Sequence, residues 1–345
     1  MKAYRKALLC VLACCVVISG CASRANTSVG SAIESTSDSD QTKRVSPYLS
    51  ITETVYLDKE QTQMESICVI YDFKRRKLIQ KGCVPYTSGY PLTTYSSVQN
   101  CVFYSALSDR GDQLYQEKNG KAVQLTDQLC ALNHIVQCGD KLFLAAKYLD
   151  HYCIEPNLFD LKNRKLEKIF PDTNDDRFTW AVTCDPEANY LYFSYYSDNL
   201  QRGNLEEYNI QNHTEATEVP DCAPSTICSI DVNTQKVTPI YWTDDYIWGI
   251  AINGSNLYYS GSKSSISPKE NHTCYMVDLR TKEKTNLDIP VLISGDMAVW
   301  DNTLYCIGWN NDVRGIYMID LKTKDVRLLY KASEKGFING FSLNY

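Results

Sequence analysis

Short apolar runs separated by polar turns fill the chain from about residue 50 to its end. The runs are rich in Tyr, Val, Ile and Phe, and the segments between them are rich in Gly, Asn, Asp, Ser and Pro. Nothing in this region shows the three-to-four-residue apolar spacing of an amphipathic helix. The pattern therefore predicts an all-β protein.

One phrase recurs along these runs: an apolar residue, Asp, an apolar residue, a polar turn and a new apolar run. Its copies are centred on Asp72, Glu117 (a worn copy), Asp160, Asp231, Asp278 and Asp320. They are 42–47 residues apart, except for a gap of 71 between the third and fourth copies. This spacing is the length of a β-propeller blade. We expect each Asp to cap a tight hairpin by accepting hydrogen bonds from nearby backbone N–H groups.

A second apolar run lies upstream of each Asp phrase and a third precedes most of these, so each repeat supplies one four-stranded antiparallel blade. The run just upstream is clearest at 142–145, 191–194 and 257–260. Six copies predict six blades. The long gap contains an insertion at 199–224, between the second and third strands of the fourth blade. A ring of seven blades is the alternative, but the insertion that would have to supply the seventh is strongly polar.

The two ends of the repeat region predict how the ring closes. The first blade begins with what reads as a second strand (52–58), and the chain ends in an apolar run at 336–343 that reads as an innermost strand. Pairing these two segments would remove two exposed sheet edges at once. The predicted fold is a six-bladed β-propeller over residues 47–345, closed by pairing the C-terminal strand with the N-terminal blade.

Residues 1–20 have the features of a signal peptide. A basic start is followed by an apolar stretch at 7–18 that is too short to span a bilayer. The stretch ends in Ile18-Ser19-Gly20-Cys21, which resembles the bacterial lipobox. The resemblance implies lipidation of Cys21 and anchoring on the extracytoplasmic face of the cell membrane; an ordinary secretory signal is the alternative. Residues 21–46, rich in Ser and Thr, are predicted to form a flexible tether.

Charge and cysteine usage narrow the function classes. Residues 1–20 contain three basic and no acidic residues, so their removal changes the net charge from −6 to −9. An acidic exported domain argues against nucleic-acid binding. The eleven cysteines after Cys21 show neither CxxC nor zinc-ligand spacing, so no metal or cofactor is predicted. Most are expected to be small buried hydrophobes, and Cys222/Cys228 and Cys130/Cys138 are candidate local disulfides.

The aromatic strands carry a family resemblance. Leu257-Tyr258-Tyr259-Ser260 and Leu191-Tyr192-Phe193-Ser194 lie where YWTD-type propellers, as in low-density lipoprotein receptors, carry their signature. The region from about residue 50 resembles bacterial lipoproteins of unknown function that share this receptor-like six-bladed design. The literal Tyr241-Trp242-Thr243-Asp244 is out of phase, at the end of a fourth strand, and is treated as a coincidence.

In a propeller, the fourth-to-first and second-to-third strand connections share one face, which we call the loop face. Irregular loops on a rigid scaffold are common binding sites, and aromatic rings beside carboxylates and amides suit a sugar or a peptide. The ligand-binding candidates on this face are Asp176, Arg177, Tyr195, Tyr196, Trp242, Asp244, Asp245, Tyr246, Trp309, Asn310 and Asp312. Alternatively, Trp242 and Trp309 pack between blades and the acids are solvated. The first-strand residues Trp180, Trp248 and Trp300 are expected in the core or lining the channel.

Metal binding and catalysis find little support in the sequence. Asp172–Asp176 resembles the start of a calcium loop but lacks the Gly and the closing Glu. No GxSxG or HExxH motif is present, and no acid or nucleophile partner is evident for any histidine: His134, His151, His213 or His272. The sequence favours a surface-anchored binding lipoprotein that recognises a glycan, a peptide or a partner protein. The alternatives are a polysaccharide-active enzyme with paired channel carboxylates and a scaffold of an envelope complex.

Overall fold

The computed structural model describes residues 47–85, 90–171, 175–185, 189–217, 221–265 and 272–344. All of them belong to one compact unit. The predicted signal peptide, Cys21 and the tether up to residue 46 lie outside the described residues. So do residues 172–174, which form most of the calcium-like segment.

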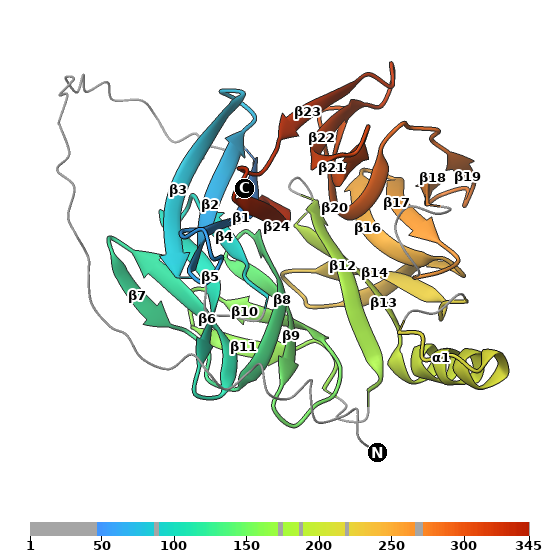
Figure 1. Ribbon diagram of the computed structural model, residues 1–345, viewed down its shortest axis with the longest axis horizontal. Helices are drawn as coiled ribbons and strands as arrows, with labels where there is room; N and C mark the ends of the chain where they lie inside the picture. Colours follow the sequence, from blue (N-terminus) through green and yellow to red (C-terminus); the bar gives the residue numbers. More distant parts are fainter. Residues whose placement is uncertain are drawn as a thin grey trace. The chain divides into compact units, whose positions relative to one another are not determined.

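Six four-stranded antiparallel sheets surround a central channel and form a β-propeller (Figure 1), as predicted. Blade 1 contains, from the inside outwards, β24 (Gly336–Asn344), β1 (Tyr48–Tyr56), β2 (Met64–Asp72) and β3 (Lys77–Pro85). Blade 2 contains β4 (Thr93–Ser96), β5 (Cys101–Ser108), β6 (Gly111–Lys118) and β7 (Lys121–Gln124). Blade 3 contains β8 (Leu129–Cys138), β9 (Lys141–Tyr148), β10 (Glu155–Asp160) and β11 (Lys165–Lys168).

The remaining three blades follow in chain order. Blade 4 contains β12 (Arg177–Asp185), β13 (Tyr190–Ser197), β14 (Ser225–Asp231) and β15 (Val237–Thr243). Blade 5 contains β16 (Tyr246–Asn253), β17 (Asn256–Ser262), β18 (Thr273–Asp278) and β19 (Lys284–Asn286). Blade 6 contains β20 (Leu292–Trp300), β21 (Thr303–Asn310), β22 (Val313–Asp320) and β23 (Val326–Tyr330).

The ring closes through the last strand of the chain, which confirms the predicted pairing. β24 runs antiparallel to β1, with Leu343 opposite Leu49 and Phe337 opposite Thr54. The buried carboxylate of Glu53 reinforces the closure by accepting hydrogen bonds from the backbone N–H of Ser333 (2.8 Å) and from the hydroxyl of Tyr330. The last turn of blade 6 is therefore bound directly to blade 1.

The repeated Asp residues cap hairpins, as expected. The Asp160 carboxylate accepts hydrogen bonds from the backbone N–H groups of Lys162 and Asn163, both at 2.8 Å. The fourth residue after each of the five Asp residues is left-handed, as at Arg164 (φ 54°). In the hairpins after Asp160, Asp231, Asp278 and Asp320, the N–H of this residue donates to the Asp carbonyl. Hydrogen bonds from Lys141 and from these N–H groups lower the pKa of Asp160 to about 2. The repeated phrase therefore has a structural role, because the same five-residue Asp-capped hairpin turn occurs five times.

The hydrophobic core lies between neighbouring blades. Phe103 of blade 2 packs in one cluster with Leu144 of blade 3, and Ile227 of blade 4 in another with Tyr259 of blade 5. Each middle strand is covered on both faces, and residues 142–146 of β9 are all buried. Strands covered on both faces read as continuous apolar runs rather than alternating ones.

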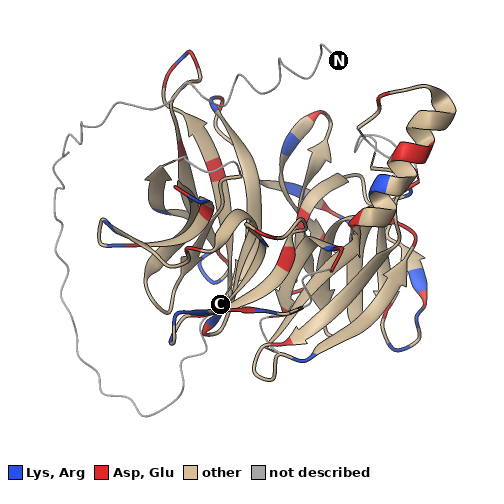
Figure 2. Cartoon of the chain, turned by 90° about the horizontal axis from the view of Figure 1, so that it is seen from below, with Lys and Arg blue, Asp and Glu red and all other residues tan. Residues whose placement is uncertain are grey.

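The insertion in blade 4 contains a helix that the sequence pattern did not predict. α1 (Asp198–Asn212) begins at Ser197, whose side chain accepts a hydrogen bond from the backbone N–H of Leu200. Acidic and basic residues both lie along it (Figure 2), and only Asp198 is buried. α1 contacts the core through the partly buried Leu205 but has no continuous apolar stripe that would reveal the helix in the sequence. Ser197 as an N-cap and Asp198 in the first turn were the available signals. No helix in the described part of the chain has the length and apolarity needed to cross a membrane.

None of the eleven cysteines of the described region forms a disulfide, and nine of them are buried. The two candidate disulfides are therefore wrong. Cys130 and Cys138 lie near opposite ends of the extended strand β8, far beyond the roughly 7 Å that a disulfide can bridge. Cys222 packs beside Tyr196 and Tyr246, whereas Cys228 belongs to a different core cluster.

Candidate functional site

The central channel opens on the loop face into a cavity of about 330 Å³. Each of the six blades contributes to it, because the inner strands all start at this face and Tyr90 leads into blade 2. The cavity is lined by Tyr90, Asn133, His134, Trp180, Ala181, Trp248, Ser294, Gly295, Asp296, Ile307, Arg314 and Asn339. Its volume is within the range of small-molecule sites.

One wall of the cavity is aromatic. Tyr246 lies between the two cavity indoles, 5.8 Å from the ring of Trp180 and 5.0 Å from the ring of Trp248. Trp248 is fixed by a hydrogen bond from its Nε1 to the Oγ of Ser262 (3.0 Å) and by the stacked ring of His272 at 4.7 Å. The wall is thus held rigidly before any ligand arrives.

A close approach of two inner strands supports this wall. A Cβ atom on Gly249, the neighbour of Trp248 in β16, would lie 2.2 Å from the carbonyl oxygen of Gly295 in β20. Only a residue without a side chain allows the two backbones to come so close. Gly249 therefore sets the distance between Trp248 and the polar residues on β20.

Charged side chains line another part of the cavity. His134 Nδ1 lies 3.9 Å from Asp296 Oδ1, and Asp296 Oδ2 accepts a hydrogen bond from the backbone N–H of Phe341 at 2.8 Å. Burial raises the pKa of Asp296 and lowers that of His134, because each charged form loses hydration. Arg314 donates from Nη1 to the carbonyl oxygen of Ile338 at 3.0 Å. Burial lowers the pKa of Arg314 as well.

The first-strand tryptophans divide between two places. Trp180 and Trp248 line the cavity, in agreement with the prediction. Trp300 packs against the core at the seam between blades 1 and 6, stacked on Phe73 with ring centres 5.9 Å apart. That groove is on the face with the Asp hairpins, away from the channel mouth.

The eleven candidate residues predicted from the sequence border this cavity or lie further out, and none of them lines it. Tyr246 and Tyr196 are buried behind the aromatic wall, with ring centres 5.9 Å apart. Trp309 is opposite Arg314 in the pairing of β21 with β22. Asn310 is the last residue of β21, and Asp312 is in the turn that follows.

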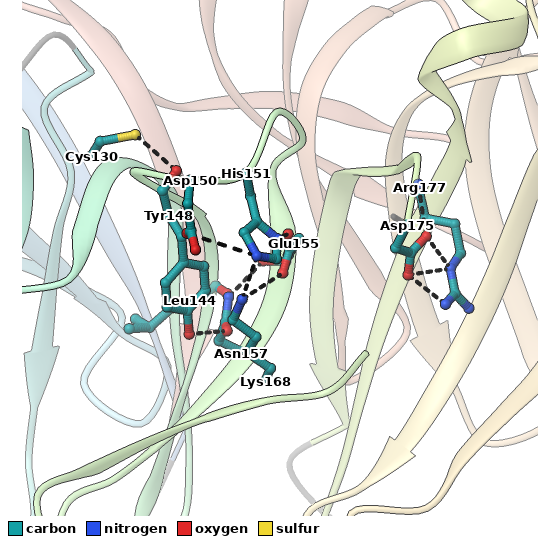
Figure 3. A network of polar contacts seen from close by, with 10 residues as sticks. All are labelled: Cys130, Leu144, Tyr148, Asp150, His151, Glu155, Asn157, Lys168, Asp175 and Arg177. Carbon is teal, nitrogen blue, oxygen red and sulfur yellow. Dashed lines mark hydrogen bonds and ion pairs between the residues drawn. The ribbon is translucent and has the colours of Figure 1, made fainter. Parts of the chain in front are cut away.

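The other predicted residues are engaged in structural contacts or exposed on the rim. Arg177 is bound to Asp175 (Nε to Oδ1, 2.7 Å), as Figure 3 shows, and its guanidinium lies over Phe170. Asp176 accepts a hydrogen bond from Ser197, and Tyr195 packs on Phe193 and Phe170.

In the connection between blades 4 and 5, the tryptophan and the two acids differ in exposure. Trp242 is 57% exposed and Asp244 is exposed. Asp245 is buried, and its oxygens accept from Tyr259 (2.9 Å) and lie 3.0 Å from Lys284 and 3.2 Å from Lys263.

Two of the four histidines do have acidic partners, which corrects the expectation from the sequence. Besides His134 with Asp296, His151 is bound to Glu155 through Nδ1, and its Nε2 lies 2.9 Å from Nζ of Lys168 (Figure 3). His151 and Glu155 are buried inside blade 3. This second cluster fastens the loop between β9 and β10 and is a structural pair.

Asp296, His134 and Arg314 were missed because no local motif marks them. Asp296 and Arg314 are on different strands of blade 6 and His134 is on blade 3, so the three side chains meet only in the folded ring. The one available signal was position, since every first strand of a propeller borders the channel. Among the described residues, no cluster of three or more His, Cys, Asp or Glu side chains could hold a metal ion.

The fold places the protein in the class of six-bladed β-propellers. Neither a family model nor a curated protein matches the chain. Among solved structures, it is similar to a chain in a crystal structure of a nidogen–laminin complex, with a TM-score of 0.56 and 11% identity, covering 87% of this chain and 98% of that one. It is also similar to TolB from Acinetobacter baumannii, with a TM-score of 0.55 and 11% identity, covering 87% of this chain and 67% of that one. These likenesses concern the fold alone.

Proposed function

We propose that the protein is a lipid-anchored binding protein of the cell envelope that holds its ligand at the channel mouth on the loop face. The observation that carries the proposal is the cavity itself, in which a fixed aromatic wall faces buried polar groups. Such a site suits a ligand with one flat apolar face and several polar groups, as in a sugar ring or a peptide end. The nidogen–laminin complex offers a precedent of binding by a protein of this fold.

The number of acids at the cavity favours binding over glycoside hydrolysis. Hydrolysis of this kind needs two carboxyl groups flanking the bond, roughly 5 to 9.5 Å apart. Among the described lining residues, only Asp296 is an acid. A polysaccharide-active enzyme is therefore the weaker proposal.

The ligand site is tested by truncating the aromatic wall. We expect Trp180→Ala or Trp248→Ala in the soluble chain, residues 22–345, to weaken capture of a partner from the protein's own envelope extract. A loss of about 2 kcal/mol for a central aromatic residue corresponds to a roughly thirtyfold drop in affinity. Affinity is measured by quantitative pull-down followed by titration of the captured partner.

The control is Trp242→Ala, which removes an exposed tryptophan away from the cavity. The three variants must also show wild-type thermal melting. If Trp242→Ala or Trp309→Ala abolishes capture while both cavity variants bind normally, the site lies on the outer rim and the channel mouth is not involved.

The anchor is tested separately, because it depends on Cys21 and not on the propeller. We expect Cys21→Ser to abolish incorporation of labelled fatty acid and to shift the protein from the membrane fraction to the soluble exported fraction. Metabolic labelling and cell fractionation measure both effects, with Cys10→Ser as the matched control. A Cys21→Ser protein that stays lipid-labelled would refute the anchor and leave the cavity proposal intact.

A further inference from the structure

We infer that the channel mouth selects an anionic ligand, whose carboxylate pairs with Arg314 while its ring stacks on Trp180 or Trp248. The inference rests on the proposed function and names the ligand class for that site. It follows from a guanidinium that lines the cavity and has no acidic partner.

The position of Arg314 is fixed by the backbone rather than by an acid. It is the second residue of β22, and its guanidinium donates a hydrogen bond from Nη1 to the carbonyl oxygen of Ile338 in the inner strand β24. A guanidinium has five N–H donors in a planar fork. One donor holds the group in place, so the others remain for a ligand.

Arg177, also half-buried on the loop face, is an arginine whose guanidinium has a carboxylate partner, and it can be compared with Arg314. Arg177 binds both oxygens of Asp175 through Nε, at 2.7 Å each. In the described part of the chain, no carboxylate lies within 4.0 Å of Arg314, although acids outnumber bases 41 to 35 in the sequence. A charge-assisted partner is therefore missing at the one arginine that lines the cavity.

Asp296 does not take this role. One of its oxygens is used by the backbone N–H of Phe341, and the other faces His134. Its side chain is only 15% exposed. Asp296 therefore interacts with β24 and with the imidazole of His134, and the guanidinium of Arg314 remains available to an anionic ligand.

The aromatic wall defines the rest of the ligand. Trp248 is held by Ser262 and His272, so its indole is fixed in the cavity wall, next to the inner strand β20. A flat ring of five or six atoms fits such a surface, and a cavity of about 330 Å³ leaves room for little more than one ring and its substituents. The ligand class is a carboxylate attached to a pyranose or to an aromatic ring.

Matched acid and amide probes test the inference in the chain comprising residues 22–345. D-glucuronate is compared with D-glucuronamide, and N-acetylphenylalanine with its amide, by ligand-observed NMR and tryptophan fluorescence. The two pairs separate a sugar source from an aromatic source of the same carboxylate. We expect one of the acids to bind about ten- to hundredfold more tightly than its amide.

Two variants of Arg314 identify the group responsible. We expect Arg314→Gln to reduce the acid-to-amide ratio to about one, and Arg314→Lys to retain a smaller preference because it keeps charge but loses the fork. The control is Arg327→Gln, an exposed arginine on β23 of the same blade. Thermal melting shows that each variant is folded.

Three outcomes would overturn the inference: equal binding of acid and amide, a preference for the acid that survives in Arg314→Gln, or no binding of either acid at millimolar concentration. If a partner is still captured from envelope extract in a Trp180-dependent way, the proposed function stands and only the anionic ligand class is removed.

Discussion

Deletion of residues 336–345 is expected to prevent the protein from folding into a closed ring. β24 supplies the whole inner strand of blade 1, and its residues Ile338 and Leu343 are each only 2% exposed. Truncation of such a buried side chain costs about 2–5 kcal/mol. Loss of the whole strand therefore exceeds the roughly 5–15 kcal/mol by which a domain of this kind is stable.

The polar contacts of β24 add to this loss, since the strand is bonded to several blades. Besides its pairing with β1, the backbone N–H of Phe341 donates to Asp296 of blade 6, and Asn344 Oδ1 accepts from the backbone N–H of Gln137 of blade 3 at 2.9 Å. Removing the strand leaves these groups without partners inside the channel. Each buried polar group that loses its hydrogen-bond partner lowers the stability by about a further 1–3 kcal/mol.

Circular dichroism and limited proteolysis measure the effect of the deletion. We expect the truncated chain to lose its cooperative thermal transition and to be cleaved throughout. Phe337→Ala is the control, because Phe337 is only partly buried at the start of the strand. A truncated protein that melts cooperatively at the wild-type temperature would show that the ring is held shut by the remaining blades.

The second large effect is expected from adding one methyl group to Gly249. The new Cβ would lie 2.2 Å from the carbonyl oxygen of Gly295, so β16 and β20 must separate. Overpacking in a core costs about 1–3 kcal/mol, and a clash with backbone places Gly249→Ala at the top of this range or above. The cavity wall should move with β16, so ligand binding should weaken as well.

Gly203→Ala is the matched control and is expected to have the opposite sign. Gly203 lies inside α1, and nothing is within 4 Å of a Cβ built on it. Ala is better than Gly in a helix by about 0.5–1 kcal/mol. Denaturant unfolding measures both variants. Equal stability of Gly249→Ala and wild type would show that the two strands are not held at this distance in solution.

The features that the sequence predicted correctly are those that depend on residues close together in the chain. Each Asp hairpin lies within a few consecutive residues, and its carboxylate bonds to N–H groups two or three positions away, as at Asp160. Strand 336–343 could be matched to the N-terminal blade because each end lacked one partner. Short-range turn chemistry and the rule against open edges were therefore sufficient for the blade count and for closure.

The site could not be predicted in the same way, because its groups meet only across the ring. His134 and Asp296 are on β8 and β20, and neither segment has a motif. Asp245 was predicted from the same pattern as Trp242, but Tyr259 and Lys284, which occupy its oxygens, are in other strands of blade 5. The sequence placed aromatic and acidic residues on the loop face without showing which of them are already engaged.

The order of strands in blade 1 has a consequence for how the protein is made. Five blades are built from consecutive strands and can form as the chain emerges, whereas β1 receives its inner neighbour only after the final residues have been synthesised. Until then the oldest strand of the nascent domain has one unprotected hydrogen-bonding edge, which the β24 segment of another chain would fit equally well. During biogenesis, intramolecular closure of the ring therefore competes kinetically with strand exchange between neighbouring copies.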